Sequence, residues 1–349
     1  MTIDYHRQIQ AYEAEKVNLS DAVRDDLYAK REANRNRLKA NLPERAKIRT
    51  FIPQGSMAIR TTVQEKDSDY DIDDGVSFLA ESLKGEILGI LDMTAGEVQE
   101  MVRDALKDDK FNKQPEIIGN CVRVYYAEGY HVDVPSFRVH NADTKDESQE
   151  LAGENGWRAS DPTQINVWFE KRVQELNKLQ EDAGSQFRRM IRLLKRFARS
   201  RGEKWDMPNG LKLTMLADEC FERSAGRDDK AFFFLLQKMA NRLQNSLVVS
   251  NRAQSKTPQD RLTKSESDSN MVELRRRVTE ALEKLAITWS PNTAKRVTRE
   301  AWDWVFQTDG FFEAFDAKDD EDDDKGDRGS GIAPVTPTAP FVKKETRFG

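Results

Sequence analysis

The segment Gln54-Gly55-Ser56 is followed, fifteen residues after its serine, by Asp71-Ile72-Asp73. The side chains of Tyr70–Phe78 alternate in character around the isoleucine, which is the pattern of a β-strand. Successive side chains of a strand point to opposite faces, so we expect the two aspartates to project together while the isoleucine packs behind them. Two neighbouring carboxylates repel each other strongly unless a cation lies between them, and Mg²⁺ prefers such oxygen ligands. The pair therefore predicts a metal site.

A third carboxylate, Asp133, lies in the segment Tyr130-His131-Val132-Asp133-Val134-Pro135. Cys121–Tyr126 and Tyr130–Ser136 flank a short turn and predict a hairpin, in which the two valines share one face and the aspartate takes the other. If the second strand of this hairpin lies beside Tyr70–Phe78, all three carboxylates converge. Such a cluster is typical of the two-metal sites that drive in-line phosphoryl transfer.

Each part of this pattern has an ordinary interpretation by itself. An Asp-x-Asp pair is common in a chain with 61 acidic residues, a Gly-Ser pair most often marks a turn, and Asp133 could be a solvated strand residue. Their order and spacing favour the joint interpretation, in which Gly55 lets the backbone approach a triphosphate and Ser56 donates to its oxygens. Asp71, Asp73 and Asp133 are therefore the candidate catalytic and metal-binding residues.

Helical and polar segments divide the rest of the chain. A charged helix is expected from Asp21 to Leu42, and β structure follows it up to about Asn141. The polar stretch through Ser160 is expected to be a loop, and almost every later segment has helical periodicity. Helices are predicted there at Phe187–Ala198, Leu213–Arg223, Lys230–Leu247, Met271–Leu285 and Asn292–Phe306.

We therefore expect an α+β protein with two lobes, for which its 349 residues are sufficient. Residues 1–141 would form an N-terminal helix and a mixed α/β catalytic lobe with a central β-sheet, and residues 142–315 an all-helical lobe that closes a nucleotide cleft. Residues 316–349 are acidic and then rich in Gly, Pro and Thr, so a disordered tail is expected there.

Composition restricts the class of protein. Charged residues make up 34% of the chain, and no apolar run approaches the length of a membrane span. The first residues lack the features of a signal peptide, so a cytoplasmic protein without a membrane partner is expected. Two cysteines and three histidines show no spacing typical of a zinc site or a disulfide framework, so any metal must use oxygen ligands.

At these residues the sequence resembles the polymerase-β-like nucleotidyltransferases, whose signature is Gly-Ser, a carboxylate pair on one strand and a third carboxylate on a neighbouring strand. More narrowly, it resembles the bacterial cyclic GMP-AMP synthase/DncV-like enzymes, the CD-NTases of antiphage defence. Further matches are Ser160-Asp161-Pro162, Trp168-Phe169, the helix Arg189–Phe197 and Pro208-Asn209-Gly210. The resemblance covers roughly residues 20–310.

The resemblance implies an enzyme that uses Mg²⁺, or Mn²⁺ in its place, to join ATP and GTP or other NTPs into a cyclic di- or trinucleotide with release of pyrophosphate. Its setting would be antiphage (CBASS) defence. The alternative is a same-fold enzyme that makes linear oligonucleotides or nucleotidylates a small molecule or protein. A non-catalytic nucleotide-binding module is disfavoured by the full set of carboxylates.

The resemblance also implies nucleotide contacts from Gln54, Gly55, Ser56, Lys195 and Asn209. In the family, a lysine on a helix of the second lobe contacts the triphosphate, and Lys195 occupies the matching place. It belongs to a basic stripe with three arginines, for which a solvated charged face is the alternative interpretation. Asn209 stands where the family often has serine, and its amide can also hydrogen-bond a phosphate or ribose.

The same resemblance implies expectations about two partners, DNA and a ubiquitin-transfer-like enzyme. Animal relatives grip double-stranded DNA through a zinc-binding His/Cys module, and this chain lacks the cysteines for it, so no zinc-dependent DNA binding is expected. Some bacterial relatives are encoded with a ubiquitin-transfer-like enzyme that conjugates the synthase through a C-terminal glycine. Gly349 fits that requirement, and a solubilising tether is the alternative role of the tail.

Overall fold

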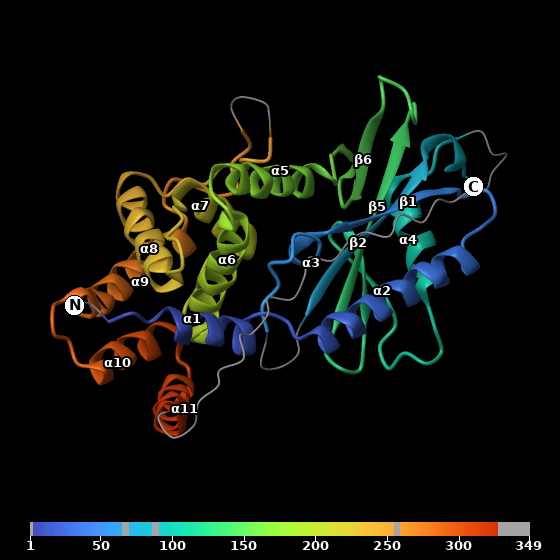
Figure 1. Cartoon of the computed structure of the whole chain (residues 1–349). Coiled ribbons are helices and arrows are strands. Elements are labelled where there is room, and N and C mark those ends of the chain that lie inside the picture. Colours follow the sequence, from blue (N-terminus) through green and yellow to red (C-terminus); the bar gives the residue numbers. More distant parts are fainter. Residues whose placement is uncertain (1–2, 65–69, 86–90, 255–258, 327–349) are drawn as a thin grey trace.

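The computed structural model describes residues 3–64, 70–85, 91–254 and 259–326. A lobe built on a β-sheet lies beside a lobe built of helices (Figure 1). The strands are β1 (Ile48–Gln54), β2 (Asp71–Leu79), β3 (Glu116–Ile118), β4 (Cys121–Tyr125), β5 (His131–His140), β6 (Ser148–Gly153) and β7 (Gly156–Ala159). The helices of the sheet lobe are α2 (Asp21–Asn41), α3 (Gly55–Ala58) and α4 (Ala95–Leu106). Those of the helical lobe are α1 (His6–Tyr12), α5 (Gln164–Leu179), α6 (Ala183–Arg199), α7 (Gly210–Cys220), α8 (Asp228–Asn245), α9 (Ser269–Ala286), α10 (Lys295–Phe306) and α11 (Phe311–Gly326).

The sheet brings the two predicted strand regions together. Its strand order is β1-β2-β5-β4-β3, with β6 paired to β5 and β7 paired to β6. β2 and β5 are parallel neighbours, so the expectation that these strands lie side by side is confirmed. β4 and β5 form the predicted antiparallel hairpin. The central strand β5 therefore lies between the strand with the Asp-x-Asp pair and the first strand of the hairpin.

One face of this sheet packs against α2 and α4 (Figure 1). Ile72, Val132 and Val134 are buried in the core that these helices share with the sheet, as strand alternation predicts. Asp74 points to this face as well, and Arg35 of α2 donates to both of its carboxylate oxygens at 2.7 and 2.6 Å. The aspartates on either side of Ile72 are thereby left for the opposite face.

The helical lobe is organised around α6. Its predicted apolar stripe is confirmed, because Phe187, Met190, Leu194 and Phe197 are completely buried in the lobe's core. The helices predicted in the second half of the chain correspond to α7, α8, α9 and α10, with ends displaced by a few residues. The two-lobed α+β fold is therefore as expected.

The start of the chain belongs to the helical lobe rather than to the sheet lobe. Tyr5, Ile9 and Tyr12 are buried in the core of the helical lobe, and α1 continues into a π-helical turn, Glu13–Val17. Residues 1–141 therefore do not form one lobe, because this first segment packs across the chain against α8 and α11. Contacts between segments so far apart in sequence leave no local pattern.

Two further expectations are wrong. The stretch through Ser160 is not a loop, since β6 and β7 continue the sheet to Ala159. β6 buries the consecutive residues Leu151, Ala152 and Gly153 and β7 is largely exposed, so neither strand shows apolar alternation. The tail does not begin at Asp316, because this residue is buried in α11, where it accepts a hydrogen bond from Gln8 at 3.0 Å. The predicted tail beyond residue 326, with Gly349, lies outside the described residues.

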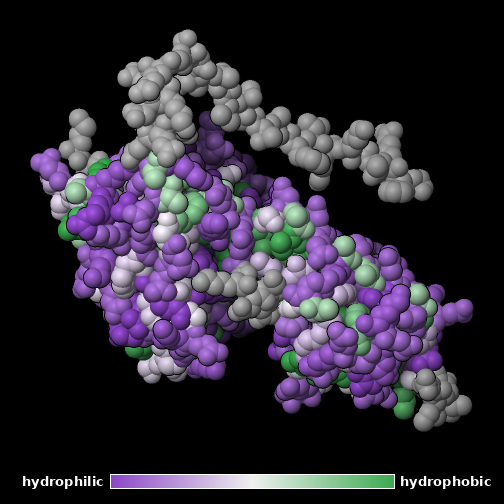
Figure 2. Space-filling view, turned by 90° about the horizontal axis from the view of Figure 1, so that it is seen from below, coloured by the Kyte–Doolittle hydropathy of each residue, from purple (hydrophilic) through white to green (hydrophobic). Residues whose placement is uncertain are grey.

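Seen from below, the molecule divides into two rounded bodies that meet at a narrower waist, and its surface is mainly hydrophilic (Figure 2). Direct hydrogen bonds join the two lobes, among them one from the side-chain amide of Asn166 in α5 to the carbonyl oxygen of Pro53 in β1, at 2.7 Å. Within the described ranges, no helix is both long enough and apolar enough to cross a membrane.

Candidate active site

Strand register aligns the three candidate carboxylates. Asp73 of β2 lies directly beside Asp133 of β5, and Asp71 lies beside His131. Because neighbours in register share a face of the sheet, all three aspartates point away from the α2 and α4 side. The side chain of Asp71 is half exposed, whereas that of Asp133 is mostly buried. The predicted common direction of the three side chains is thus present in the fold.

The carboxylate of Asp73 is largely buried beside those of Asp71 and Asp133. Burial, with the negative charges of Asp133 and Asp71, raises the pKa of Asp73 to about 6, although Arg123 acts in the opposite direction. A group that resists ionisation in this way is short of positive charge around it. A divalent cation at this place would remove the deficit.

Gly55 starts α3 directly against this carboxylate. Its backbone φ is +66°, and a Cβ added to it would lie only 1.9 Å from Oδ2 of Asp73. Both observations require glycine, since other residues rarely adopt that conformation and a side chain would collide with Asp73. The Gly-Ser turn therefore lies directly against Asp73.

The other two residues of the Gln54-Gly55-Ser56 segment differ in surroundings. The hydroxyl of Ser56 lies at the cleft between the lobes and is 2.8 Å from the hydroxyl of Thr62. Gln54 pairs with Asp73 through the β1–β2 ladder, and its side-chain amide nitrogen is buried beside Gly75 without a hydrogen-bond partner among the described residues. Gln54 is not among the residues that line the cleft bordered by Ser56.

A cleft of about 290 Å³ lies between the lobes and reaches the carboxylate pair. The sheet lobe contributes Asp71, Asp73 and the turn after β1, and the helical lobe contributes α6 and the start of α7. The residues that line it are Gly55, Ser56, Ile59, Thr61, Thr62, Val63, Tyr70, Asp71, Asp73, Ile165, Lys195, Arg199, Gly210, Leu211 and Thr214. Asp133 is not among these lining residues, and its carboxylate is bound by Arg123.

Arg123 of β4 holds Asp133. Its Nε donates to Oδ1 and its Nη2 to Oδ2 of Asp133, both at 2.8 Å, and Nη2 lies 3.5 Å from Oδ1 of Asp71. The expected convergence is therefore incomplete in this state. Among the described residues, no three His, Cys, Asp or Glu side chains lie close enough together to hold a metal ion.

Lys195 lies at the rear of the cleft with only 4% of its surface exposed. Its Nζ donates to the carbonyl oxygen and to the hydroxyl of Thr61, at 3.0 and 2.9 Å. Burial, reinforced by the nearby charge of Arg192, lowers the pKa of Lys195 to about 7. A solvated charged face is therefore the wrong interpretation for this part of the stripe, which packs against the sheet lobe.

Asn209 caps a helix in this structure. Its side-chain oxygen accepts a hydrogen bond from the backbone of Lys212 at 3.1 Å, which is the usual role of asparagine before the first turn of a helix. The next residue, Gly210, lines the cleft and lies against the side chain of Lys195. Asn209 thus orients the backbone that borders the cleft, and its nucleotide contact stays a prediction.

Sequence reasoning missed Arg123, Thr61 and Thr62. The arginine could have been found from the hairpin, because a turn centred on residues 127–129 pairs position 123 with position 133, as observed. The two threonines lie in an irregular segment after α3, which carries no pattern that would have indicated them.

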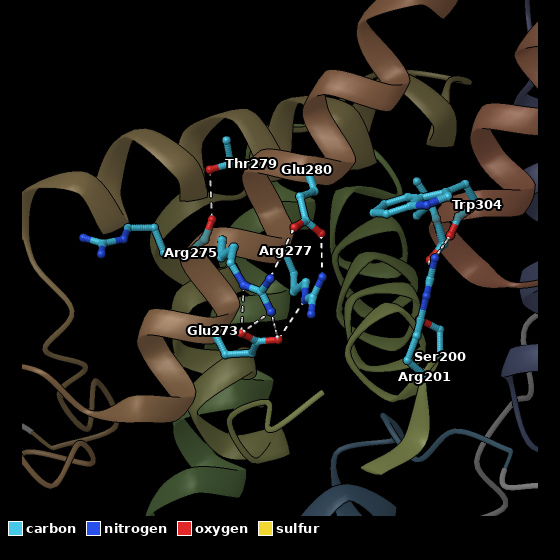
Figure 3. Close-up of polar contacts among 10 residues, drawn as sticks. Ser200, Arg201, Glu273, Arg275, Arg277, Thr279, Glu280 and Trp304 are labelled. Atoms are coloured by element: carbon cyan, nitrogen blue, oxygen red, sulfur yellow. Dashed lines mark hydrogen bonds and ion pairs between the residues drawn. The ribbon is translucent and has the colours of Figure 1, made fainter. Parts of the chain in front are cut away.

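The tryptophans lie outside the residues that line the cleft. Trp205 is flanked by the guanidinium groups of Arg201 and Arg277 at 4.4 and 4.6 Å, and Arg201 also covers Trp304. Arg277 in turn forms ion pairs with Glu273 and Glu280 of its own helix, α9 (Figure 3). This layered arrangement joins α9, α10 and the end of α6.

Comparison with known proteins agrees with this geometry. Residues 49–137 match the family model described as the nucleotidyltransferase domain of cyclic GMP-AMP synthase DncV-like proteins. This segment runs from β1 into β5 and contains all three aspartates. Within these residues the chain is similar to DncV-like nucleotidyltransferase domains. The resemblance that the motifs indicated is thereby confirmed.

Solved structures extend the similarity to the whole fold. The CD-NTase CdnG of Bradyrhizobium diazoefficiens, in complex with GTP, is 19% identical with a TM-score of 0.66, covering 90% of this chain and 100% of its own. The cyclic AMP-GMP synthase DncV of Vibrio cholerae, in complex with the linear intermediate 5′ pppA(3′,5′)pG, is 16% identical with a TM-score of 0.66, covering 88% of this chain and 96% of its own. The helical lobe therefore accompanies the nucleotidyltransferase domain in these proteins as it does here.

Proposed function

We propose that this protein is a divalent-metal-dependent nucleotidyltransferase that joins NTPs into a cyclic di- or trinucleotide and releases pyrophosphate. The observation that carries the proposal is the parallel register of β2 and β5, which sets Asp73 beside Asp133 at the end of a cleft lined by the Gly55-Ser56 turn and Lys195. ATP and GTP are the proposed substrates, because the similar CdnG and DncV structures were determined with GTP and with a linear A–G intermediate.

The donor set fits Mg²⁺ or Mn²⁺. Asp71 and Asp73 offer carboxylate oxygens at the cleft, and the raised pKa of Asp73 indicates that positive charge is missing there. Asp133 is the third proposed ligand. When bound, the metal would neutralise triphosphate charge and favour the ionised form of the attacking ribose hydroxyl.

The chain's own residues would bind and orient the triphosphate. Gly55 has no side chain to cover its backbone beside Asp73, so a triphosphate can approach the start of α3. The Ser56 hydroxyl can donate to a phosphate oxygen, and the ammonium group of Lys195 can exchange Thr61 for a phosphate. The ribose hydroxyl of one nucleotide then displaces pyrophosphate from the α-phosphorus of another, and a second such step closes the ring.

One experiment tests this function. The purified protein is incubated with the four labelled NTPs and Mg²⁺ or Mn²⁺, and the products are treated with phosphatase and identified by mass spectrometry. A cyclic product has no terminal phosphate and survives, a linear oligonucleotide loses its 5′ phosphates and so changes mass, and a nucleotidylated small molecule also survives but differs from a cyclic product in mass. Absence of any NTP-derived product, with either metal and all four NTPs, contradicts the proposal.

Phosphatase resistance separates a cyclic product from linear oligonucleotides, and the product's mass separates it from a nucleotidylated small molecule or protein. A same-fold enzyme that makes linear products uses the same carboxylates and the same attack on the α-phosphorus, so the site alone favours neither. The cyclic product and the role in antiphage defence rest on the similarity to DncV-like proteins. NTPs as substrates would place the enzyme in the cytoplasm.

A further inference from the structure

Arg123 lies within ion-pair distance of two of the three candidate metal ligands. Its guanidinium group makes two parallel hydrogen bonds of 2.8 Å to the two oxygens of Asp133 and extends to within 3.5 Å of Asp71. Such a two-point contact is the strongest geometry between an arginine and a carboxylate. The neighbouring carboxylates raise the affinity of Arg123 for its proton further, so its pKa lies above the ordinary value.

Burial makes this ion pair more than a surface contact. Only 26% of the Arg123 side chain and 13% of the Asp133 side chain are exposed. Water and salt screen such a pair less than they screen an exposed one. Three aspartates and one arginine leave this face of the sheet with excess negative charge, so the arginine reduces the repulsion but does not remove it.

The arginine and a divalent cation need the same oxygens. Mg²⁺ binds carboxylate oxygens at about 2.0–2.1 Å and demands near-octahedral geometry. Both oxygens of Asp133 already accept a hydrogen bond from Arg123, and the guanidinium group places a positive charge beside the pair that would hold the metal. The guanidinium group and a metal ion bound to the same carboxylates would repel each other. Metal binding is therefore weaker as long as Arg123 stays bound to Asp133.

We propose that Arg123 is an internal counter-ion that holds Asp133 in the metal-free enzyme, that metal binding displaces it from this carboxylate, and that it thereby sets the metal affinity. This proposal rests on the proposed metal site. Arg123 is a positioning residue, since it acts through Asp133. Its place two strands away from β2 allows the side chain to withdraw from Asp133 without moving the Asp-x-Asp pair.

Metal affinity of the apoenzyme tests the proposal without any activity measurement. Mn²⁺ binding is measured by isothermal titration and by electron paramagnetic resonance for wild type, Arg123→Gln and Arg138→Gln. The control arginine lies on β5 and forms a comparable buried pair with Glu150, outside the site. Arg123→Gln should bind Mn²⁺ roughly tenfold more tightly or better, because a repelling charge is removed. Arg138→Gln should bind as wild type does.

A second measurement uses the wild-type protein, so it does not depend on whether a variant folds. The ¹⁵N resonance of the Arg123 Nε–H group is followed during titration with Mg²⁺, and Arg123→Lys assigns it by its disappearance. The resonance should shift and its proton should exchange faster with water as Asp133 is released. An unchanged resonance at saturating Mg²⁺, or Mn²⁺ affinity of Arg123→Gln equal to or weaker than wild type, overturns the proposal.

A double variant, Asp71→Asn with Asp73→Asn, separates this proposal from the function on which it rests. If the wild type binds Mn²⁺ and the double variant does not, the metal site is established. The Arg123 variants then test the counter-ion role alone. If wild type and double variant bind Mn²⁺ equally weakly, the metal site and the counter-ion role are both overturned.

Discussion

At the scale of single residues, charge decides the character of the site. Asp71 and Asp73 lie on one face because an isoleucine separates them on a strand, and their mutual repulsion is only partly relieved by Arg123. On the opposite wall of the cleft, burial keeps Lys195 short of negative partners and lowers its pKa to about 7. The free protein therefore holds opposite charges apart across the cleft, and each side lacks the ligand charge that would stabilise it.

Asp71→Asn combined with Asp73→Asn should abolish product formation while leaving the fold intact. Amides occupy the same volume but lack the charge needed to hold the metal, and the loss of two repelling charges should leave the melting temperature of the free protein unchanged or higher. Product yield and the thermal melt are measured together. Turnover near the wild-type rate in the double variant would end the two-metal interpretation.

Lys195→Ala should raise the KM for NTP more than it lowers kcat. This outcome follows if the lysine contacts the triphosphate equally in the ground and transition states. Steady-state kinetics with varied NTP give both constants. Arg188→Ala is the matched control, since this residue lies on the same helix but pairs with the exposed Glu170. NTP kinetics that are identical for wild type and Lys195→Ala contradict the contact.

Lys195 also predicts how stability changes with pH. Its pKa is lowered in the folded protein to about 7, from 10.5 when free, so the unfolded chain binds more protons between these two values. The free energy of unfolding contributed by this group therefore rises as the pH increases from 7 towards 10. Denaturant melts across this range should show a steeper rise for wild type than for Lys195→Met. Parallel pH profiles for the two proteins would show that Lys195 is not depressed in pKa.

At the scale of elements, the turn from β1 into α3 connects the sheet to the cleft. Gly55 begins α3 with a positive φ and contacts Asp73, so the same glycine sets both the turn and the distance between backbone and carboxylate. The parallel pairing of β2 with β5 supplies the third aspartate from a strand about sixty residues later in the chain. A short turn and one strand pair therefore assemble most of the site.

Gly55→Ala should impair the site and the fold together. The added methyl group would lie 1.9 Å from Asp73 Oδ2, and alanine tolerates the φ of +66° poorly. We expect a loss of roughly 1–3 kcal/mol in the free energy of unfolding and a large loss of activity. Gly96→Ala is the control, because nothing lies within 4 Å of the Cβ added there and the position is in helix α4. Equal stability and activity of both variants would show that Asp73 can move freely.

At the scale of the whole molecule, polar contacts hold the lobes together around the cleft. Arg192 of α6 donates to Glu13 in the π-helical turn and to the carbonyl oxygen of Arg60 in the sheet lobe. Glu13 and Arg192 are both buried, so this pair links the first segment of the chain, the helical lobe and the segment after α3. The ion pair itself lies within the helical lobe, and Arg192 reaches the sheet lobe through its hydrogen bond to the carbonyl oxygen of Arg60.

Arg192→Met should be strongly destabilising. It leaves the Glu13 carboxylate buried without its partner, which typically costs about 3–5 kcal/mol. Arg188→Met, on the same helix, removes an arginine whose partner is exposed and should change stability by less than about 1 kcal/mol. Denaturant unfolding of both variants makes the comparison. Equal losses from the two variants would show that burial of the Glu13 pair is unimportant for stability.

The sequence by itself determined the elements and the main candidates of the site. Strand alternation predicted that Asp71 and Asp73 point to one face, and the hairpin predicted the direction of Asp133. Helical periodicity predicted the apolar stripe of α6. Each of these features depends on interactions between residues close in sequence. The same local rules would have found Arg123 opposite Asp133. They mistook β6 and β7 for a loop, since β6 buries consecutive residues and β7 is largely exposed, so neither shows apolar alternation.

Only the tertiary structure decided what depends on contacts between distant segments. It placed the first helix in the helical lobe, brought Lys195 to Thr61 across the cleft, and showed Asp133 bound by an arginine. Burial and electrostatic potential sum over all neighbours in space, so neither the lowered pKa of Lys195 nor the raised pKa of Asp73 could be inferred from spacing along the chain. Local sequence thus specified the direction of the strand carboxylates, and the packing of the lobes specified their charge and their partners.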